Sequence, residues 1–563
     1  MMRVYLSQIN SRVGDFAGNS EKILGEMERA RGMGADLTVF PELALCGYPP
    51  EDLLFKKHFI SDARRALERI RSAAGAGIVC VGFPHRTPHG LFNAAAILHK
   101  RKIAAVYGKI LLPNYSVFDE KRYFIPGASV CTLKTKEACI GISICEDVWG
   151  ASGPVNTLLA SGISLLINLS ASPYYRNKIA EREKKLCSLA KGAGIAVAYC
   201  NLVGGQDELV FDGGSFIINA QGRTIARAAQ FKEDACVADI EFSRQPEKNI
   251  GLAVFPITCT PVITANGQKP SIAKPAVSRF LGPVEEVFQA LVLGIRDYAH
   301  KNRFTKAVLG LSGGIDSSIV AALAAEALGK ENVLGITMPT VYSSEGTRSD
   351  AALLAEQLGI GFRKIPIQKL CEGFLQALAS DIADHAPDVA EENLQARVRA
   401  VALMFYSNKF GMLLLSTGNK SETSVGYSTL YGDLAGGFAP IKDIPKRLIY
   451  ELSEFFNTMR GKPVIPRSVI DREPTAELRH NQKDSDSLPP YPILDSILLN
   501  YVEKHESPET LVTKGHSPEI VAKVMRLVNT SEYKRRQSPP GIKTTPLSFG
   551  KDRRMPITNF YGK

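Results

Sequence analysis

At 563 residues, the chain is too long for a single hydrophobic core and is expected to form two large domains. A hydrophobic fraction of 45% and a charged fraction of 22% indicate an ordinary globular protein. The formal net charge of +11 suits an anionic partner, such as nucleic acid, an acidic membrane surface or a nucleotide, and does not choose among them.

The amino terminus and the cysteines exclude further classes. The first residues, MMRVYLSQIN, lack the charged-then-apolar pattern of a signal peptide, and no apolar run reaches the roughly twenty residues of a membrane span. We therefore expect a cytoplasmic enzyme without a membrane partner. The 10 cysteines form no CxxC pair and no His/Cys cluster, which argues against a disulfide framework or a zinc site.

Residues 1–265 contain short apolar, β-rich runs between helical stretches, for example DLTVFPE, GIVCVGF and ISLLINLS. This rhythm predicts an α/β domain with buried strands. The polar, proline-containing sequence TANGQKPSIAKPAVS follows at 264–278 and has no periodicity. We therefore place a linker at 266–280.

Residues 281–563 open with a helical pattern, VEEVFQALVLGIRDYAH, that leads into the strand AVLGL at 307–311. Loop, helix, strand and helix then follow in turn. This alternation predicts a second α/β domain with a parallel, doubly wound sheet.

The sequence LGLSGGIDSS at 309–318 places glycine and serine between this strand and the next helix. Open α/β sheets bind ligands at such strand ends, where a helix amino terminus offers free N–H groups to phosphate. The loop lacks the lysine of the familiar phosphate-binding loop. Asp316 would repel phosphate unless a cation lay between them, and we therefore interpret it as a magnesium ligand.

In this setting the loop resembles the SGGxDS loop of the N-type ATP pyrophosphatases, and an ordinary strand-to-helix turn becomes the weaker interpretation. These enzymes cleave ATP between the α and β phosphates, hold pyrophosphate in this loop and transfer AMP to a carbonyl oxygen. The resemblance implies ATP contacts along the whole loop, from Gly310, Leu311, Ser312, Gly313, Gly314, Ile315, Asp316 and Ser317.

A second string, LLLSTGNKSETSVGYSTLYGD at 413–433, again places a strand before a polar loop. Thr417 is a candidate ATP contact, Glu422 a second carboxylate for the metal, and Lys442 a compact cation for a phosphate. Taken singly, each is as readily a solvated surface residue. The whole string resembles the corresponding segment of NAD synthetases.

By that resemblance, the remaining residues contact ATP or the dinucleotide substrate, deamido-NAD. Thr475, in REPTAEL, fits an ATP contact, and Lys534 lies in a basic carboxyl-terminal segment that otherwise suggests a nucleic-acid tail. Asn393 is our choice for a dinucleotide contact, with Arg397 and Arg399 as alternatives on charge grounds. The other expected dinucleotide contacts are Glu422, Tyr427, Thr429, Leu430 and Asp433.

Three strings in the first half each carry one reactive side chain. Glu42 stands in FPELALCGYP, Lys109 in YGKILLPNYS, and Cys145 at the end of the apolar strand in ISICEDVWG. A cysteine is a good nucleophile once a base or cation favours its thiolate. Glu42 would be that base, and Lys109 would stabilise an oxyanion. The alternative without a catalytic function is a buried cysteine with two charged residues at the surface.

Together, in this order, the strings resemble the nitrilase/amidase superfamily and its Glu-Lys-Cys triad. The resemblance implies an α-β-β-α sandwich for the first domain and adds Glu120, in FDEKRYF, beside the triad. The ICEDVW form is similar to the glutaminase branch, which implies glutamine contacts at Tyr115, Ser172 and Lys178.

Both halves resemble the glutamine-dependent NAD synthetases. That family implies release of ammonia from glutamine through a thioester on Cys145, and ATP- and Mg²⁺-dependent adenylation and amidation of deamido-NAD. We expect small-molecule partners, no nucleic acid, and a homo-oligomer. The rival is another amidating or thiolating ATP pyrophosphatase, including a tRNA-modifying one. A binding protein with a basic nucleic-acid surface is the alternative from a different class.

Overall fold

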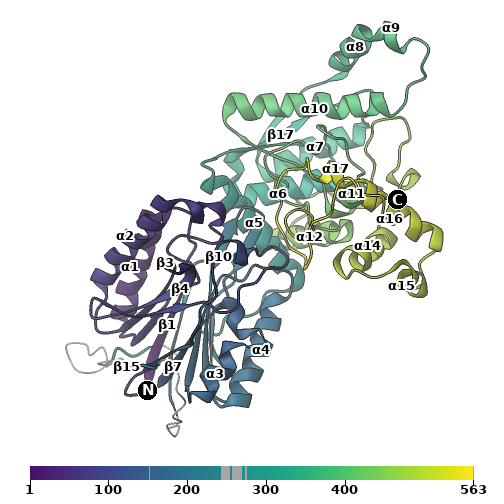
Figure 1. Ribbon diagram of the computed structural model, residues 1–563. Helices are drawn as coiled ribbons and strands as arrows, with labels where there is room; N and C mark the ends of the chain where they lie inside the picture. The colour runs from purple at the N-terminus through teal and green to yellow at the C-terminus, as the bar shows by residue number, and fades with distance from the viewer. Residues whose placement is uncertain (151–152, 243–253, 257–268, 273–274, 562–563) are drawn as a thin grey trace. The chain divides into compact units, whose positions relative to one another are not determined.

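The structure is a computed structural model that describes residues 1–150, 153–242, 254–256, 269–272 and 275–561 (Figure 1). It forms two compact units, one made of Met1–Gln206 and Val210–Leu281, the other of Asp207–Leu209 and Gly282–Lys563. Each unit is described by itself.

The linker predicted at 266–280 lies partly outside the described residues, which omit 257–268 and 273–274. Its described part packs on the first unit. The Arg3 guanidinium donates to the carbonyl of Pro270 at 2.7 Å, and the Arg227 N–H donates to the carbonyl of Ala276 at 3.0 Å. A polar sequence without periodicity can still be held by backbone hydrogen bonds, which no side-chain pattern reveals.

The first unit contains two large sheets. The six-stranded sheet has the order β14-β1-β2-β3-β4-β5, and the seven-stranded sheet has the order β13-β12-β9-β8-β7-β6-β15. The strands of the first sheet are β1 (Met2–Gln8), β2 (Leu37–Val39), β3 (Ile78–Thr87), β4 (Gly90–His99), β5 (Lys102–Gly108) and β14 (Asp234–Ile240). Those of the second are β6 (Cys131–Lys134), β7 (Cys139–Ile144), β8 (Leu165–Ser170), β9 (Ala196–Asn201), β12 (Phe216–Ile218), β13 (Thr224–Arg227) and β15 (Val254–Pro256). A small ribbon pairs β10 (Val203–Gln206) with β11 (Leu209–Asp212).

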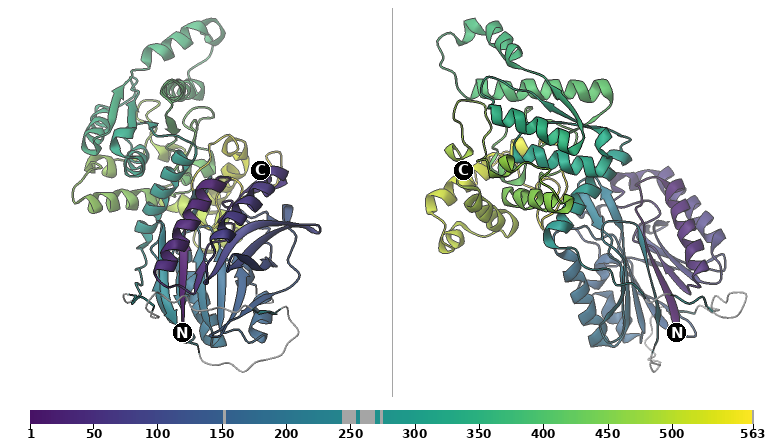
Figure 2. Two further views of the ribbon diagram at one scale, coloured as in Figure 1. Left: turned by 90° about the vertical axis from the view of Figure 1, so that its left-hand side faces the viewer. Right: turned by 180° about the vertical axis from the view of Figure 1, so that it is seen from behind.

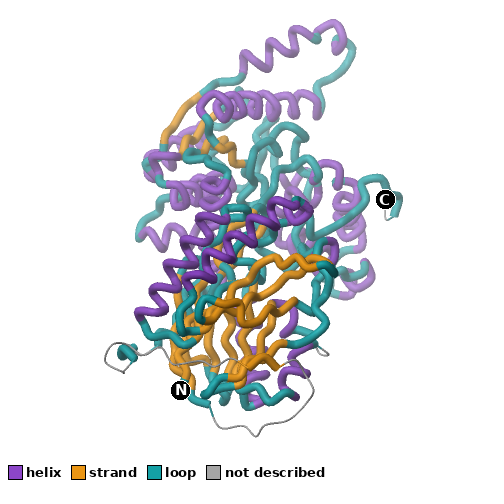
Figure 3. Tube along the Cα trace, turned by 60° about the vertical axis from the view of Figure 1, so that its left-hand side comes forward, coloured by secondary structure: helices purple, strands orange, loops and turns teal. Residues whose placement is uncertain are grey.

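Four layers result, because each sheet is buried on both faces. One apolar cluster fills the space between the sheets, where Val4 and Val39 of one sheet join Ile142 and Ile167 of the other. Two further clusters lie under the outer helices, which are α1 (Phe16–Gly32), α2 (Lys57–Ala73), α3 (Pro154–Ala160) and α4 (Lys178–Ala193). Figure 3 shows α1 and α2 along one side of the strands, and Figure 1 shows α3 and α4 along the other. The predicted α-β-β-α sandwich is confirmed.

The parallel strands of this unit align the ends that carry functional residues. Strands β7, β8 and β9 are parallel neighbours, and the register pairs Ile144 with Leu169. Cys145 is the residue after Ile144, and Ser170 is the residue after Leu169. The two therefore lie side by side where these neighbouring strands end.

The second unit is built on a wholly parallel sheet with the order β18-β17-β16-β19. Its strands are β16 (Ala307–Gly310), β17 (Val333–Thr337), β18 (Gly361–Lys364) and β19 (Leu413–Leu415). Helices cover both faces, and Figure 1 shows α6 (Ile315–Leu328) and α10 (Val389–Phe410) on opposite sides of β17. The predicted doubly wound sheet is confirmed. The order reverses between β16 and β19, which is where such sheets form a ligand crevice.

Further helices complete this unit. They are α5 (Pro283–Lys301), α7 (Glu345–Leu358), α8 (Gln368–Ala377), α9 (Ala379–Ile382), α11 (Lys420–Val425), α12 (Lys446–Arg460), α13 (Arg467–Asp471), α14 (Tyr491–Leu498), α15 (Pro508–Thr513), α16 (Pro518–Thr530) and α17 (Glu532–Arg535). In both views of Figure 2, α8 and α9 extend away from the sheet. None of the helices in the described part of the chain has the length and apolarity to cross a bilayer.

Candidate active sites

In the first unit, four predicted side chains come together from separate elements. Glu42 follows β2, Lys109 follows β5, Cys145 follows β7, and Glu120 stands in a short 3-10 helix. The Lys109 ammonium lies 2.7 Å from a carboxylate oxygen of Glu42 and 2.7 Å from one of Glu120. The structure thus assembles charged residues that the sequence separates by up to 78 positions, from Glu42 to Glu120.

The ammonium of Lys109 is wholly buried. Burial alone would lower the pKa of this lysine, but the carboxylates of Glu120 and Glu42 raise it well above the usual range. Transferring an unpaired ion from water into a protein interior costs roughly several kcal/mol of free energy. The attraction between Lys109 and its two carboxylates must offset this cost. Lys109 is therefore a permanent positive charge.

The Glu42 carboxylate is held on both oxygens. One accepts from Lys109 and from the Asn93 amide at 2.7 Å, and the other accepts from the Ala171 N–H at 2.9 Å, in the loop after β8. The neighbouring Glu120 accepts from the Tyr48 hydroxyl at 3.0 Å, and burial raises its pKa to about 7. Glu42 is thus fixed in position and can accept a proton without moving.

Cys145 stands on a sharp turn. It directly follows β7, begins the 3-10 helix η3 (Cys145–Val148), and has a φ of 40°. This left-handed conformation is unfavourable for a residue with a Cβ and is typical of functional sites. Burial and the Glu42 carboxylate raise the pKa of the thiol, against the effect of Lys109. The raised pKa favours the neutral thiol, which would need a base to become a nucleophile.

The predicted glutamine contacts are arranged in two places around this turn. The Tyr115 hydroxyl donates to the Glu146 carboxylate at 3.0 Å, beside Cys145. The Ser172 N–H donates to the Asn201 side chain at 3.0 Å, and the Lys178 ammonium donates to the carbonyl of Pro173 at 2.7 Å. Glu146, which we did not select from the sequence, stands directly after Cys145 in the chain, and this position was a usable signal.

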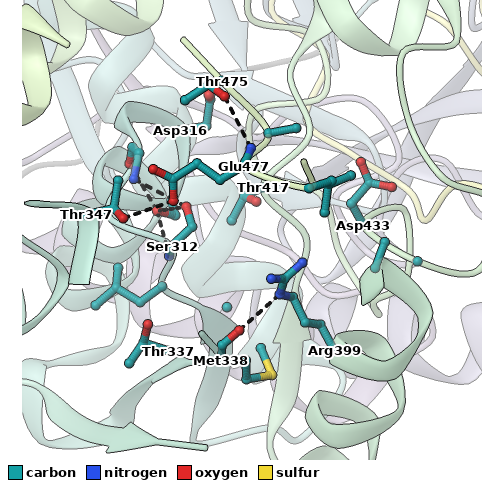
Figure 4. A pocket seen from close by; sticks show the side chains of 18 of the residues that line it. Ser312, Asp316, Thr337, Met338, Thr347, Arg399, Thr417, Asp433, Thr475 and Glu477 are labelled. Atoms are coloured by element: carbon teal, nitrogen blue, oxygen red, sulfur yellow. Dashed lines mark hydrogen bonds between the residues drawn. The ribbon is translucent and has the colours of Figure 1, made fainter. Parts of the chain in front are cut away.

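In the second unit, a pocket opens where β16, β17 and β19 end (Figure 4). Most residues predicted for ATP and the dinucleotide line it, namely Gly310, Leu311, Ser312, Gly314, Ile315, Asp316, Ser317, Thr417, Glu422, Tyr427, Thr429, Asp433 and Thr475. Five predicted residues do not line it: Gly313, Asn393, Leu430, Lys442 and Lys534.

The loop between β16 and α6 is shaped to present N–H groups and hydroxyls. The Ser312 and Ser317 hydroxyls are 3.1 Å apart, and the Gly314 N–H donates to Ser312 at 3.2 Å. Gly313 has a φ of 85°, and a Cβ there would stand 2.1 Å from the carbonyl oxygen of Thr347. Only glycine fits this position, and the loop leads directly into the amino terminus of α6, which favours phosphate.

Both predicted metal-binding carboxylates face one ammonium group, that of Lys446. Its Nζ lies 2.5 Å from Asp316 and 3.1 Å from Glu422. Burial raises the pKa of Glu422 to about 7, and Asp316 adds to this effect. Two carboxylates beside a phosphate loop are a donor set that fits Mg²⁺, which takes its remaining ligands from phosphate and water.

Lys442 is placed differently from the prediction. It is buried outside the pocket, where its ammonium donates to the carbonyl of Pro539 at 2.8 Å. Lys446, four residues later, opens α12 and lines the pocket instead. Both lysines follow the same polar loop, and only the start of α12 decides which one faces the nucleotide site.

The remaining dinucleotide candidates lie on the segment after α11. The Thr429 hydroxyl donates to Asn393 at 2.6 Å, and its N–H donates to Asp433 at 2.5 Å. Burial raises the pKa of Asp433 to about 6. Lys534 donates to the carbonyls of Gly426 and Ser428 at 2.8 and 2.7 Å. Asn393 and Lys534 therefore support the lining residues from behind.

Of the two alternative arginines, Arg399 lines the pocket and Arg397 does not. Arg397 instead donates to the carbonyl of Leu430 at 3.2 Å. Arg399 donates to the carbonyl of Met338 at 3.2 Å, and burial lowers its pKa. In Figure 4 it lies on the same side of the pocket as Asp433, across from Ser312.

Sequence reasoning missed the residues that connect the phosphate loop to the segment around Thr475. Glu477 accepts from the Thr347 hydroxyl at 2.9 Å (Figure 4). Arg472 donates to the carbonyl of Gly313 at 3.1 Å. Both stand in or beside REPTAEL, whose charged residues were the available signal.

Comparison with known proteins defines the class. The carbon-nitrogen hydrolase family matches residues 3–246, and the NAD synthase family matches residues 287–538. The chain is therefore an enzyme that joins a nitrilase-type hydrolase domain to an NAD synthase domain.

Full-length relatives narrow this class. The glutamine-dependent NAD(+) synthetase of Thermotoga maritima is 44% identical over 99% of this chain and 98% of the relative. The solved structure of the enzyme of that name from Acinetobacter baumannii, in complex with ADP, is 36% identical, with a TM-score of 0.75 over 99% of this chain and 98% of that one. The one from Cytophaga hutchinsonii, 23% identical, shares the fold with a TM-score of 0.83 over 100% and 98%. The chain belongs to the glutamine-dependent NAD(+) synthetase family, which confirms the predicted resemblance.

The raised pKa of Cys145 predicts how its reactivity depends on pH. Below that pKa the thiolate fraction grows tenfold per pH unit, and alkylation by iodoacetamide should rise about tenfold per unit between about pH 7 and pH 9. Mass spectrometry of the labelled peptide would measure the rate, with Cys145→Ala to correct for other thiols. A plateau below about pH 8 would contradict the neutral resting thiol.

The placement of the two lysines predicts that only one of them affects the KM for ATP. Lys446→Gln removes a cation from the nucleotide pocket and should raise the KM for ATP about tenfold or more in the ammonia-dependent reaction, as expected for a charged contact. Lys442→Gln, a change of equal size outside the pocket, should leave this KM within about twofold. Equal effects of the two substitutions would contradict the placement.

Proposed function

We propose that the chain converts deamido-NAD to NAD(+), using ATP and ammonia that it releases from glutamine. The observation that carries this proposal is the presence of two clusters of charged residues in one chain. Each places a lysine between two carboxylates, one beside a cysteine on a strained turn and one beside a phosphate loop.

In the first unit, Cys145 attacks the side-chain carbonyl carbon of glutamine while Glu42 takes the thiol proton. Lys109 and the N–H of Glu146 stabilise the oxyanion that forms. Glu42 returns the proton to the leaving nitrogen, the C–N bond breaks, and ammonia leaves a γ-glutamyl thioester. Water, deprotonated by Glu42, then attacks the thioester, the C–S bond breaks, and the thiol and glutamate form. Tyr115, Ser172 and Lys178 are the proposed glutamine contacts.

In the second unit, a nicotinate carboxylate oxygen attacks the α phosphorus of ATP. The bond between the α and β phosphates breaks, and the loop from Gly310 to Ser317 holds the pyrophosphate that leaves. Asp316 and Glu422 would hold Mg²⁺, which supplies charge neutralisation between the phosphates when bound. Thr417, Thr475 and Lys446 are the remaining proposed ATP contacts.

Ammonia then attacks the acyl carbon of the adenylate, and AMP leaves as the amide forms. A free carboxylate would resist this attack, because its charge is spread over two oxygens and repels nucleophiles. Free ammonia is scarce at neutral pH, where most of it is ammonium. The ammonia made at Cys145 therefore needs a sheltered route to the adenylate.

We also propose a homo-oligomer that forms through α10. Val401, Phe405 and Phe410 on this helix expose 70%, 61% and 57% of their surface, and the first two are one turn apart on the same face. Apolar residues exposed together on one helix mark an interaction surface. The proposed location is the cytoplasm, where ATP, glutamine and dinucleotides are available.

Two substitutions separate the two half-reactions. Cys145→Ala should abolish glutamine-dependent formation of NAD(+) and retain the ammonia-dependent rate within about twofold, because the synthetase pocket is untouched. Asp316→Asn should lower the rate from either nitrogen source at least about a hundredfold, because it removes one of the two carboxylates that would hold Mg²⁺ beside the phosphates. NAD(+) formation is the measurement. Glutamine use by Cys145→Ala, or normal ammonia-dependent turnover of Asp316→Asn, would refute the respective role.

The oligomer proposal predicts that charge on α10 breaks the assembly. The double variant Val401→Asp, Phe405→Asp should lower the molar mass measured by light scattering, because an unpaired buried charge opposes association. Phe55→Asp, which alters a side chain of the first unit that is also 57% exposed, is the matched control. A mass unchanged in the double variant would exclude α10 as the interface.

A further inference from the structure

We propose that Asp147 is the positioning residue of the cysteine site, bridging the segment that carries Lys109 and the turn that carries Cys145. This inference rests on the proposed glutaminase reaction. Asp147 lies two residues after the nucleophile, in η3, and is wholly buried. The reaction steps described above do not use its carboxylate.

The two oxygens of this carboxylate accept from backbone N–H groups of two different segments. Oδ1 accepts from the N–H groups of Leu111 and Ile110 at 2.9 and 3.2 Å, directly after Lys109. Oδ2 accepts from the N–H of Ile144 at 2.9 Å, directly before Cys145. One rigid carboxylate thus fixes backbone atoms adjacent to both the ammonium-bearing and the sulfur-bearing residue.

A fourth hydrogen bond strengthens the bridge. The buried Tyr107 hydroxyl donates to Oδ2 at 2.8 Å, and Tyr107 stands at the end of β5, two residues before Lys109. The segment around Lys109 is therefore held to Asp147 from both sides. Its own backbone is fixed as well, since the Lys109 N–H donates to the carbonyl of Asn93 at 2.8 Å.

The bond to Ile144 also maintains the unfavourable turn at Cys145. A residue with a φ of 40° tends to relax toward ordinary backbone angles unless its neighbours prevent it. Asp147 ties the residue before the turn to the residue two positions after it. The turn is thereby closed while the sulfur remains at the edge of the sheet.

The partners of Asp147 distinguish it from the other buried acids of this unit. Asp212 pairs with Arg182, and Glu183 pairs with Arg227. Among the described residues, Asp147 forms no salt bridge, and all its hydrogen-bond donors are uncharged N–H and O–H groups. Burial raises its pKa, and the N–H donors of Leu111 and Ile144 oppose this. A carboxylate that accepts mainly from backbone N–H groups holds the segments that carry those groups in fixed relative positions.

The test is Asp147→Asn in the full chain. The asparagine keeps the size but presents an NH₂ group to one pair of donors, so that one catalytic segment loses its anchor. Glutamate release should fall about a hundredfold in kcat with a change in KM for glutamine below about threefold, as expected when reacting groups are misplaced by about 1 Å. Ammonia-dependent NAD(+) formation should stay unchanged, which reports an intact second unit.

Two further variants keep this test decisive. Glu183→Gln breaks a buried ion pair of the same unit away from both segments, and should lower thermal stability while leaving kcat unchanged at temperatures where the protein is folded. Tyr107→Phe removes one hydrogen bond and keeps the carboxylate. It should lower kcat about tenfold at constant KM, which covers the case in which Asp147→Asn does not fold.

A folded Asp147→Asn variant whose kcat is within about threefold of the unchanged protein would overturn the inference. If Asp147→Asn does not fold, a Tyr107→Phe variant with unchanged kcat would do the same. If Glu183→Gln lowers kcat as much as Asp147→Asn does, the loss of kcat reflects the general stability of the unit and not the position of Asp147. That result would also overturn the inference. Absence of glutamate release by the unchanged protein would overturn the proposed function and this inference together.

Discussion

The buried ammonium of Lys109 is the interaction on which the first site depends. Its two carboxylate partners come from different parts of the chain, Glu42 after β2 and Glu120 from the loop after β5. Removing Lys109 would leave two carboxylates facing each other in a dry interior, which is strongly destabilising. The ion cluster therefore contributes to the packing of this unit at the same place where it positions the candidate catalytic residues.

The second unit uses the same charge pattern for a different purpose. Lys446 also stands between two carboxylates, but Asp316 and Glu422 line an open pocket and not a closed interior. Substrate phosphates entering this pocket bring negative charge, and the existing ammonium compensates part of it. The first cluster thus fixes geometry, whereas the second is prepared to exchange partners with a ligand.

Much of this could be predicted from local strings. Strand ends predicted where Cys145 and the loop at Ser312 would stand, because a parallel sheet places such ends at one edge. The choice between Lys442 and Lys446 could not be made, since it depends on where α12 begins. The role of Asp147 could not be predicted either. It accepts from backbone N–H groups of two segments, and every residue except proline carries such a group whatever its side chain.

The neutral state of the Cys145 thiol has a consequence for the lifetime of the enzyme. Oxidants such as peroxides attack exposed thiolates, whereas Cys145 is only 3% exposed and its raised pKa favours the protonated thiol. If Cys145 loses its proton only as a substrate bond forms, the thiolate that oxidants attack is formed only during the reaction. The burial that raises the pKa of this thiol would then also protect it from oxidation between turnovers.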